Sequence, residues 1–308
     1  MAAASPLVKM KDVKGKRLIF PEWKDARIIE AADILRTKYK IEPLLLNPAD
    51  ISSEARDDLA RTYSAGPRSS KITIVRRLLE RPLFLAAMLV KTGEADAMVA
   101  GAAHPTKKII EAGMMAIGLA DGITVPSSFF LMRQKNRSLI FADCAVNIDP
   151  SAEELCDITL ASAKSATQLL GSEPRIAFLS FSTHGSANHA SVTKIQRATA
   201  MARAAMPDLA IDGELQVDAA LDPGVAAKKL RLRSDVAGRA NVLIFPNLDA
   251  ANIGYKLVQY LGGAQAIGPV LQGFAKPVTD LSRGATVQDI VDASLLTASM
   301  ALTNGYTM

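Results

Sequence analysis

Short apolar runs alternate with apolar residues at helical spacing along the chain. Residues 16–21 (KRLIFP) form an apolar run that ends at a proline, which is typical of a buried strand. After Asp25 the apolar positions recur at helical spacing, and a second apolar run, 42–46 (EPLLL), follows and ends in Asn47-Pro48. The first 48 residues therefore predict a strand, a helix and a second strand.

The same alternation continues to the end of the chain. It favours open, mostly parallel sheets, because a crossover helix returns the chain to a parallel strand. At 308 residues the chain has about twice the usual domain length, so we predict an α/β fold with two domains. The last helix has no later strand to pair with, so we expect it to pack on the first domain. The further elements expected are helices over 77–89, 106–117, 152–170, 191–205, 253–261 and 289–302, and strands over 97–99, 124–132, 138–141, 176–180, 210–212, 242–245 and 270–271.

The composition is that of a globular protein, with 49% hydrophobic and 22% charged residues. Lys and Arg number 36 against 31 Asp and Glu, and the resulting charge of +5 suits a phosphorylated ligand no less than nucleic acid. Aromatic residues make up only 5%, too few for the stacking platforms of single-strand nucleic-acid binders. We therefore expect small-molecule substrates and no nucleic acid.

Several classes of protein are excluded by what the sequence lacks. Two cysteines, Cys144 and Cys156, provide neither a disulfide framework nor a CxxC metal pair, and no run of 18 apolar residues occurs. We therefore expect a cytoplasmic protein without membrane association. The dinucleotide GxGxxG, the P-loop, HExxH and GxSxG are also absent, and the three histidines lack zinc-ligand spacing, so we expect no metal.

Two loops that follow predicted strands are rich in small and polar residues. They are residues 100–104 (AGAAH) and 180–187 (SFSTHGSA). In an open parallel sheet, ligands bind outside the carboxyl ends of the strands, where loop amides attract anions. Both loops are therefore candidate phosphate sites, although small and polar residues also simply form turns and helix caps.

A third loop, within residues 268–286, carries Ser282-Arg283-Gly284 just before the last predicted helix. A hydroxyl, a guanidinium and backbone donors placed together can hold a phosphoryl group or polarise a carbonyl oxygen. Asp289 lies three residues after Thr286, which is also the spacing of a capping box. A structural role and a chemical role for Asp289 are therefore both open.

Seven segments of the sequence stand out as longer motifs. They are FPE, VAGAAH, FADCAV, LSFSTHGSA, DGELQVDAA, GRANVLIFPNLDAANIGYKL and GPVLQGFAKPVTDLSRG. Together they strongly resemble the phosphate acetyltransferase (phosphotransacetylase) family. The resemblance covers about residues 16–301 and is closest to the short form, including the ethanolamine-utilisation type. It implies two α/β domains, residues 1–121 plus 279–308 and residues 122–278, with the active-site cleft between them.

The resemblance implies the reversible conversion of acetyl-CoA and phosphate to acetyl phosphate and CoA through a ternary complex. Asp289 matches the family's proposed base for the CoA thiol, Ser282 the residue that stabilises the transition state, and Arg283 the residue that holds the phosphate. CoA is then a substrate, no tightly bound cofactor is needed, and a homodimer is expected because family members are commonly dimers. The residues expected to contact substrates are Ser180, Ser182, Thr183, Gly185, Ser186, Lys276, Gly284, His104, Lys107 and Lys108.

The sequence departs from the family's pattern at two positions. Glu111 stands where the family usually has an arginine thought to hold CoA, and we expect Lys107 and Lys108 to supply the positive charge instead. Ala285 stands where a cysteine often follows the Ser-Arg-Gly step, which argues against a covalent thiol there. Two alternatives to acetyl transfer stay open: transfer of another short acyl group such as butyryl, and a non-catalytic acyl-CoA-binding module.

Overall fold

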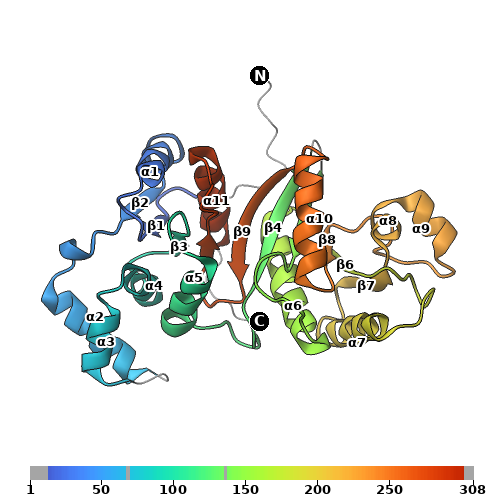
Figure 1. Cartoon of the computed structure of the whole chain (residues 1–308), viewed down its shortest axis with the longest axis horizontal. Helices are drawn as coiled ribbons and strands as arrows, with labels where there is room; N and C mark the ends of the chain where they lie inside the picture. Colours follow the sequence, from blue (N-terminus) through green and yellow to red (C-terminus); the bar gives the residue numbers. More distant parts are fainter. Residues whose placement is uncertain (1–12, 67–69, 135–136, 302–308) are drawn as a thin grey trace. The chain divides into compact units, whose positions relative to one another are not determined.

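The computed structural model describes residues 13–66, 70–134 and 137–301, which divide into two compact units (Figure 1). Among these residues, 122–273 form unit 1, and 13–121 with 274–301 form unit 2. Each unit contains its own strands, helices and hydrophobic core, and the chain has the α/β fold that the sequence predicted. Within the described part of the chain, no helix has the length and apolar character needed to cross a membrane.

The sheet of unit 2 has four parallel strands in the order β2-β1-β3-β10. They are β1 (Arg17–Phe20), β2 (Glu42–Leu45), β3 (Ala97–Ala100) and β10 (Val278–Asp280). Because all four strands run the same way, the loops that follow β1, β3 and β10 leave the sheet from the same edge.

Helices cover both faces of this sheet (Figure 1). On one face, α1 (Ala26–Tyr39) and α11 (Val287–Met300) pack against each other and against the buried side chains of β1 and β3. On the other face lie α4 (Pro82–Thr92) and α5 (Thr106–Ala112), with a π-helical turn, η2 (Gly113–Ile117), after α5. The remaining helices of unit 2 are η1 (Pro48–Asp50), α2 (Ser53–Ala65) and α3 (Ile72–Leu78).

Several elements of unit 2 differ from the sequence prediction, and helix α2 was not expected at all. The single helix expected over 77–89 is two helices, α3 and α4, because Pro82 has no N–H to continue a helix and instead starts α4 at its first position. Strand β10 was not expected, because its residues lie within the segment 268–286 that was predicted to be a loop. It pairs in parallel with β3, which places Asp280 beside Ala100.

The sheet of unit 1 has six strands in the order β9-β4-β5-β8-β6-β7. Strands β5, β8, β6 and β7 run parallel to one another, and β4 runs antiparallel to β5 and to β9. The sheets are therefore mostly parallel, as predicted. The strands are β4 (Ser127–Gln134), β5 (Arg137–Ala142), β6 (Arg175–Leu179), β7 (Ala210–Leu215), β8 (Val242–Ile244) and β9 (Gln265–Gln272).

Five helices flank the sheet of unit 1 (Figure 1). On one face, α6 (Ala152–Leu169) packs against α7 (Ala190–Ala205). On the other face, α8 (Val217–Leu221) and α10 (Leu248–Tyr260) contribute to a core that includes Phe130, Phe141 and Phe245, and α9 (Pro223–Lys229) follows α8 directly.

A buried amide joins the sheet of unit 1 to helix α6. Gln272, at the end of β9, donates from Nε2 to Ser127 Oγ (3.0 Å) and Ser162 Oγ (2.8 Å), and its Oε1 accepts from Ser165 Oγ (3.1 Å). All four side chains are buried. The network therefore satisfies polar groups that would otherwise lose their water without replacement.

We predict that Gln272→Leu lowers the free energy of unfolding by about 2–3 kcal/mol, because it removes one hydrogen bond from each of three buried hydroxyls and leaves Ser162 and Ser165 only their bonds to backbone carbonyls. Urea denaturation followed by circular dichroism measures the change. The matched control is Gln134→Leu, which breaks one exposed bond to Gly262 O and is expected to change stability by about 0.5 kcal/mol or less. Equal effects of the two substitutions would contradict the role assigned to the network.

Candidate active site

Three loops meet at the carboxyl edge of the unit 2 sheet. They follow β1 (residues 21–25), β3 (101–105) and β10 (281–286). The order β1-β3-β10 makes these strands neighbours, so their loops start side by side. The second and third loops carry His104 and the Ser282-Arg283-Gly284 step that the sequence singled out.

The buried carboxylate of Glu22 organises the loop after β3. Its Oε2 accepts backbone N–H bonds from Gly101 (2.9 Å) and Ala102 (2.8 Å), and its Oε1 accepts from Ala103 (2.8 Å) and His104 (3.0 Å). We expected these amides to be a candidate site for a phosphate. In the structure they hold a carboxylate of the same chain, so the four donors are already satisfied.

Glu22 also positions the side chain of His104. His104 Nδ1 lies 2.8 Å from Glu22 Oε1, and the imidazole is 37% exposed while the Glu22 side chain is 2% exposed. The imidazole thus has one nitrogen fixed inside the protein and faces solvent with the rest of the ring.

Arg27, in the first turn of α1, joins the loops after β3 and β10. Its guanidinium donates to the carbonyl oxygens of Arg283 (2.8 Å), Ala285 (2.9 Å) and Ala102 (3.0 Å), and it forms an ion pair with Asp25 (2.7 Å). The hydrogen bonds from Arg27 lower the pKa of the Asp25 carboxyl and outweigh its burial, which raises the pKa. Arg27 therefore holds the backbone of both loops from the protein side.

All three residues of the Ser282-Arg283-Gly284 step are exposed. Ser282 Oγ accepts a bond from the Gly284 amide at 3.2 Å, and among the described residues we find no acceptor bonded to the Arg283 guanidinium. With its backbone fixed by Arg27 and its side chain open to solvent, Arg283 is available to bind an anion.

Asp289 forms the capping box that its spacing allowed. Its Oδ2 accepts from the Thr286 amide (2.9 Å) and from Thr286 Oγ1 (2.7 Å), and its own amide donates to Thr286 Oγ1 (3.2 Å). The side chain is nevertheless exposed, and its bonds within the described residues use Oδ2 only. Oδ1 is therefore left to act on a ligand, and the capping role does not exclude a chemical one.

Asp280, two residues before Ser282, is the least satisfied polar side chain of this edge. It is 2% exposed, its Oδ2 accepts from Thr106 Oγ1 at 2.5 Å, and its buried Oδ1 has no hydrogen-bond partner among the described residues. Burial is the main cause that raises the pKa of Asp280 to about 6; the charge of Glu22 raises it further, and the bond from Thr106 opposes the rise.

Gly101 is required where β3 and β10 come closest. Its φ is +118°, and a Cβ there would lie 2.4 Å from the backbone nitrogen and oxygen of Leu281 and 2.6 Å from Asp280 Oδ1. A side chain at this position would therefore push the loops after β3 and β10 apart.

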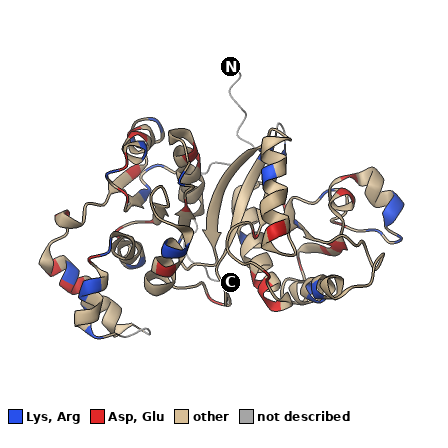
Figure 2. Cartoon of the chain, viewed as in Figure 1, with Lys and Arg blue, Asp and Glu red and all other residues tan. Residues whose placement is uncertain are grey.

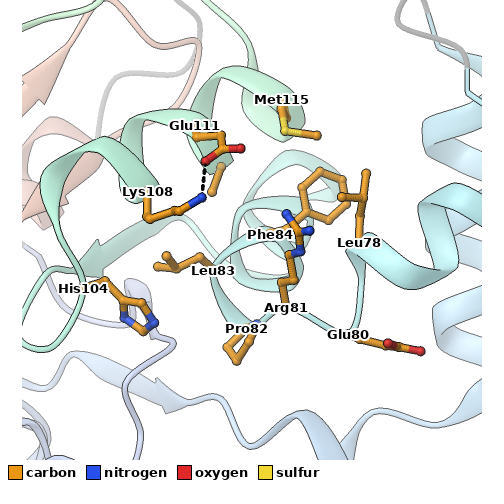
Figure 3. Close-up of a pocket in the computed structure, with 11 residues that line it drawn as sticks. Leu78, Glu80, Arg81, Pro82, Leu83, Phe84, His104, Lys108, Glu111 and Met115 are labelled. Atoms are coloured by element: carbon orange, nitrogen blue, oxygen red, sulfur yellow. Dashed lines mark hydrogen bonds and ion pairs between the residues drawn. The ribbon is translucent and has the colours of Figure 1, made fainter.

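A pocket of about 460 Å³ opens beside His104 (Figure 3). Arg81, at the start of α4, and Lys108, on α5, line it together with Glu80 and Glu111. Lys108 Nζ bonds to Glu111 Oε2 at 2.9 Å, and this bond is the main cause that lowers the pKa of Glu111. The apolar part of the lining consists of Leu78, Pro82, Leu83, Phe84, Ala112 and Met115.

Sequence reasoning did not find Arg81, because nothing along the chain links it to residues 104–111. In Figure 2 the ribbon of α5 is coloured for both positively and negatively charged residues, in keeping with the Lys108–Glu111 pair. Lys107 lies on the first turn of the same helix but is not part of the pocket lining.

Lys276 is separated from the other predicted residues of unit 2. It precedes β10, and the following Pro277 bonds through its oxygen to the Met98 amide. Ser282 follows β10, so Lys276 lies at the opposite, amino-terminal edge of the sheet. The structure thus brings together His104, Ser282, Arg283 and Gly284, and leaves Lys276 outside the group.

The predicted substrate loop of unit 1 also closes on a carboxylate of its own chain. Ser182 Oγ (2.8 Å) and the Gly185 amide (2.7 Å) donate to Glu214 Oε1, and the Thr183 amide donates to Ser186 Oγ (2.9 Å). Burial raises the pKa of Glu214, but these hydrogen bonds outweigh burial and the net shift is downward.

Ser180, Ser182, Thr183, Gly185 and Ser186 therefore lie together in one loop, which follows β6. The Ser180 Oγ accepts from the Ser182 amide at 3.2 Å. Much of the loop's hydrogen-bonding capacity is thus used within the protein.

Among the described residues, no group of three or more His, Cys, Asp or Glu side chains has an arrangement that could hold a metal ion. The candidate site consists of hydroxyl, guanidinium, carboxylate and imidazole groups.

We predict that Asp280 makes folding pH-dependent. Its pKa is higher in the folded than in the unfolded chain, so its contribution to stability is present below about pH 4 and is lost as the pH rises through 6. The loss amounts to about 3 kcal/mol, the equivalent of roughly two pKa units. Urea denaturation of the wild type and Asp280→Asn at pH 4 to 8 should show this difference between them. Asp208→Asn, at an exposed turn, is the control, and parallel curves for wild type and Asp280→Asn would refute the prediction.

Comparison with known proteins places the chain in one family. The family model of the phosphate acetyl/butaryl transferases matches residues 52–298. A phosphate acetyltransferase of Thermoanaerobacterium thermosaccharolyticum is 41% identical over 98% of this chain and 100% of its own length. One from Corynebacterium glutamicum is 42% identical over 96% of each chain.

Solved structures agree with the sequence relatives. A phosphotransacetylase from Streptococcus pyogenes superimposes with a TM-score of 0.87 at 37% identity, over 94% of this chain and 96% of that one. The EutD phosphotransacetylase from Staphylococcus aureus gives the same TM-score at 36% identity, over 98% of this chain and 100% of that one. The resemblance seen in the sequence motifs is thereby confirmed, and the chain belongs to the phosphate acetyl/butaryl transferase family of acyltransferases.

Proposed function

We propose that this chain, as a phosphate acetyltransferase, transfers an acetyl group between CoA and inorganic phosphate in a ternary complex at the carboxyl edge of the unit 2 sheet. The observation that carries the proposal is the Ser282-Arg283 step, whose backbone is fixed by Arg27 while its side chains are exposed. No metal and no tightly bound cofactor enter the proposed reaction.

Each side chain at this edge has a role that its chemistry supports. Arg283 would hold the phosphoryl group through two parallel N–H bonds, as a guanidinium does with phosphate. Ser282 Oγ would donate to the carbonyl oxygen as negative charge develops there, a contribution of about 3 kcal/mol in comparable sites. Asp289 would take the proton of the CoA thiol through Oδ1, because a thiol with a pKa near 8.5 is only a few per cent thiolate at neutral pH.

CoA is an anion, and the pocket beside His104 offers it positive charge. Lys108 shares its charge with Glu111, but no described residue is bonded to the Arg81 guanidinium. We propose that Arg81 and Lys108 bind CoA phosphate groups, with Lys107 beside them. Glu111 stands where the family has an arginine, and Arg81 would supply the positive charge that is missing at that position.

The loop of unit 1 that follows β6 is proposed to contact substrate through Ser180, Thr183 and the exposed Gly185 and Ser186, with the buried Ser182 shaping it through its bond to Glu214. Gly284 adds a backbone donor next to Arg283. Lys276 is proposed only as a more distant positive charge, since it lies at the other edge of the sheet.

The two units support a division into two domains, and we propose the boundaries expected from the sequence, 1–121 plus 279–308 and 122–278. Residues 1–12 and 302–308 lie outside the described residues. We also propose a cytoplasmic location, which is supported by two free, buried cysteines.

A homodimer is proposed on the basis of the surface of α10. Ile253, Leu257, Tyr260 and Leu261 recur at helical spacing along one side of this helix, and each is more than half exposed. Such a row of apolar side chains is typical of a subunit interface. We propose that a second copy of the chain covers it.

We predict that Asp289→Asn separates capping from catalysis. Asparagine can still accept the Thr286 bonds but cannot take a proton, so kcat should fall by about 10²–10⁴-fold while the melting temperature stays close to that of the wild type. Thioester formation from acetyl phosphate and CoA, followed by ultraviolet absorbance, measures kcat. Gln288→Ala, one residue away and exposed, is the control and should retain wild-type turnover.

A wild-type protein without turnover on acetyl, propionyl and butyryl phosphate would contradict the proposed function. CoA binding without turnover would then indicate an acyl-CoA-binding module. A higher kcat/KM with butyryl phosphate would change the acyl group but not the reaction. Full activity of Asp289→Asn would leave Asp289 with its capping role alone.

We predict that Leu257→Asp breaks the dimer, because it places a charge within the apolar row of α10. Size-exclusion chromatography with light scattering should give twice 32.7 kDa for the wild type and 32.7 kDa for the variant. Leu232→Asp, which is 79% exposed but outside α10, is the control and should stay dimeric. A monomeric wild type would contradict the proposed dimer.

A further inference from the structure

His104 and Glu22 form a pair in which a buried carboxylate orients an imidazole. Glu22 Oε1 lies 2.8 Å from His104 Nδ1, and both carboxylate oxygens accept backbone N–H bonds. Because every other contact of this carboxylate is with a donor, the carboxylate accepts from Nδ1 as well, and the proton of the neutral ring lies on Nδ1. Nε2 then carries a lone pair.

His104 borders the pocket. His104 is one of the lining residues, and no described residue is bonded to its Nε2 (Figure 3). The arrangement of a buried carboxylate, an imidazole and an open ring nitrogen is the one by which enzymes position a histidine as a general acid and base. Glu22 cannot serve as that group itself, since its side chain is 2% exposed.

The loop of His104 is tied to the Ser282-Arg283 loop. Arg27 bonds to Ala102 O on one side and to Arg283 O on the other, and β3 and β10 are adjacent. Arg27 therefore holds the loop of Arg283, and any anion that Arg283 binds, next to the loop of His104.

The proposed reaction needs a second proton-transfer group. When CoA attacks acetyl phosphate, the thiol loses a proton to Asp289, the sulfur–carbon bond forms and the carbon–oxygen bond to phosphate breaks. The leaving phosphate oxygen then needs a proton. Asp289 does not deliver this proton at the moment when it takes one from the thiol. In the reverse direction, phosphate must lose that proton before it attacks the thioester.

We propose that His104 is a catalytic residue that donates a proton from Nε2 to the leaving phosphate and removes it from the attacking phosphate in the reverse direction. This inference rests on the proposed function. The proton that Asp289 takes from the thiol returns to His104 through solvent, so that in total one proton moves from CoA to phosphate and no other reactant is consumed. Imidazole suits this transfer because it is the side chain that ordinarily titrates between pH 5 and 8.

Several charged groups surround the pair. Glu22 is bonded to the ring, and Arg81, Lys108, Glu80 and Glu111 line the pocket beside it. Asp280 of β10 lies close enough to Glu22 for their charges to interact, and Arg27 approaches the same loop.

The test is the pH dependence of kcat/KM for phosphate from pH 5 to 9 in the thioester-consuming direction. We expect the wild type to show a limb between pH 5 and 8 that His104→Gln lacks, together with a fall in kcat of about 10²–10⁴-fold. Added imidazole should restore part of the activity of His104→Ala. Glu22→Gln, which keeps an acceptor but loses the charge, should shift the limb to lower pH if the variant folds.

His189→Gln is the matched control, because His189 is an exposed histidine at the start of α7 and should leave kcat within about twofold. If His104→Gln keeps the wild-type limb, or changes only KM while kcat is unaltered, the inference is overturned and His104 only binds substrate. Those outcomes require an active wild type, so they differ from failure of the proposed function, in which the wild type itself shows no turnover.

Discussion

The carboxylate of Glu22 is the interaction on which the candidate site depends. Four consecutive amides, from Gly101 to His104, point at one buried side chain that comes from a different loop. Without that acceptor the buried amides of Gly101 and Ala102 would be unpaired, at a cost of about 1–3 kcal/mol each, and the part-buried amides of Ala103 and His104 would lose their partner as well. The carboxylate thus determines the path of the loop after β3, the position of His104 and the place where α5 begins.

In each unit, a carboxylate of the chain accepts hydrogen bonds from a loop that follows a parallel strand. Glu22 holds the loop after β3, and Glu214 holds the loop after β6 through Ser182 and Gly185. Loops that wrap around an anion need small residues and available amides whether that anion is a ligand or a side chain. This explains why both loops had the composition of a phosphate site, and it leaves the exposed Arg283 as the clearest binding group for a substrate anion.

The architecture could be predicted from the sequence because it depends on patterns that repeat along the chain. Buried parallel strands are continuous apolar runs and the helices between them have apolar positions at helical spacing, so the α/β fold and the mostly parallel sheets were expected. The break at Pro82 was missed although a proline marks it locally, whereas the three-residue strand β10 is defined by its pairing with β3, which only the folded chain provides. In the site, the Ser282-Arg283 step and the cap at Asp289 were readable locally, whereas the pairing of Glu22 with residues 101–104 spans about 80 positions. Arg81 and the orphaned oxygen of Asp280 were missed for the same reason.

The capping box at the start of α11 has a consequence for how activity responds to heat. The Asp289 side chain is held by Thr286, so its rotational entropy is given up when the protein folds and not when substrate binds. The first turn of a helix is also the part that frays before the rest of the protein unfolds. Fraying there would release the carboxylate from its fixed orientation while both sheets stay intact, so an enzyme that relies on Asp289 should lose turnover on warming before it loses its fold.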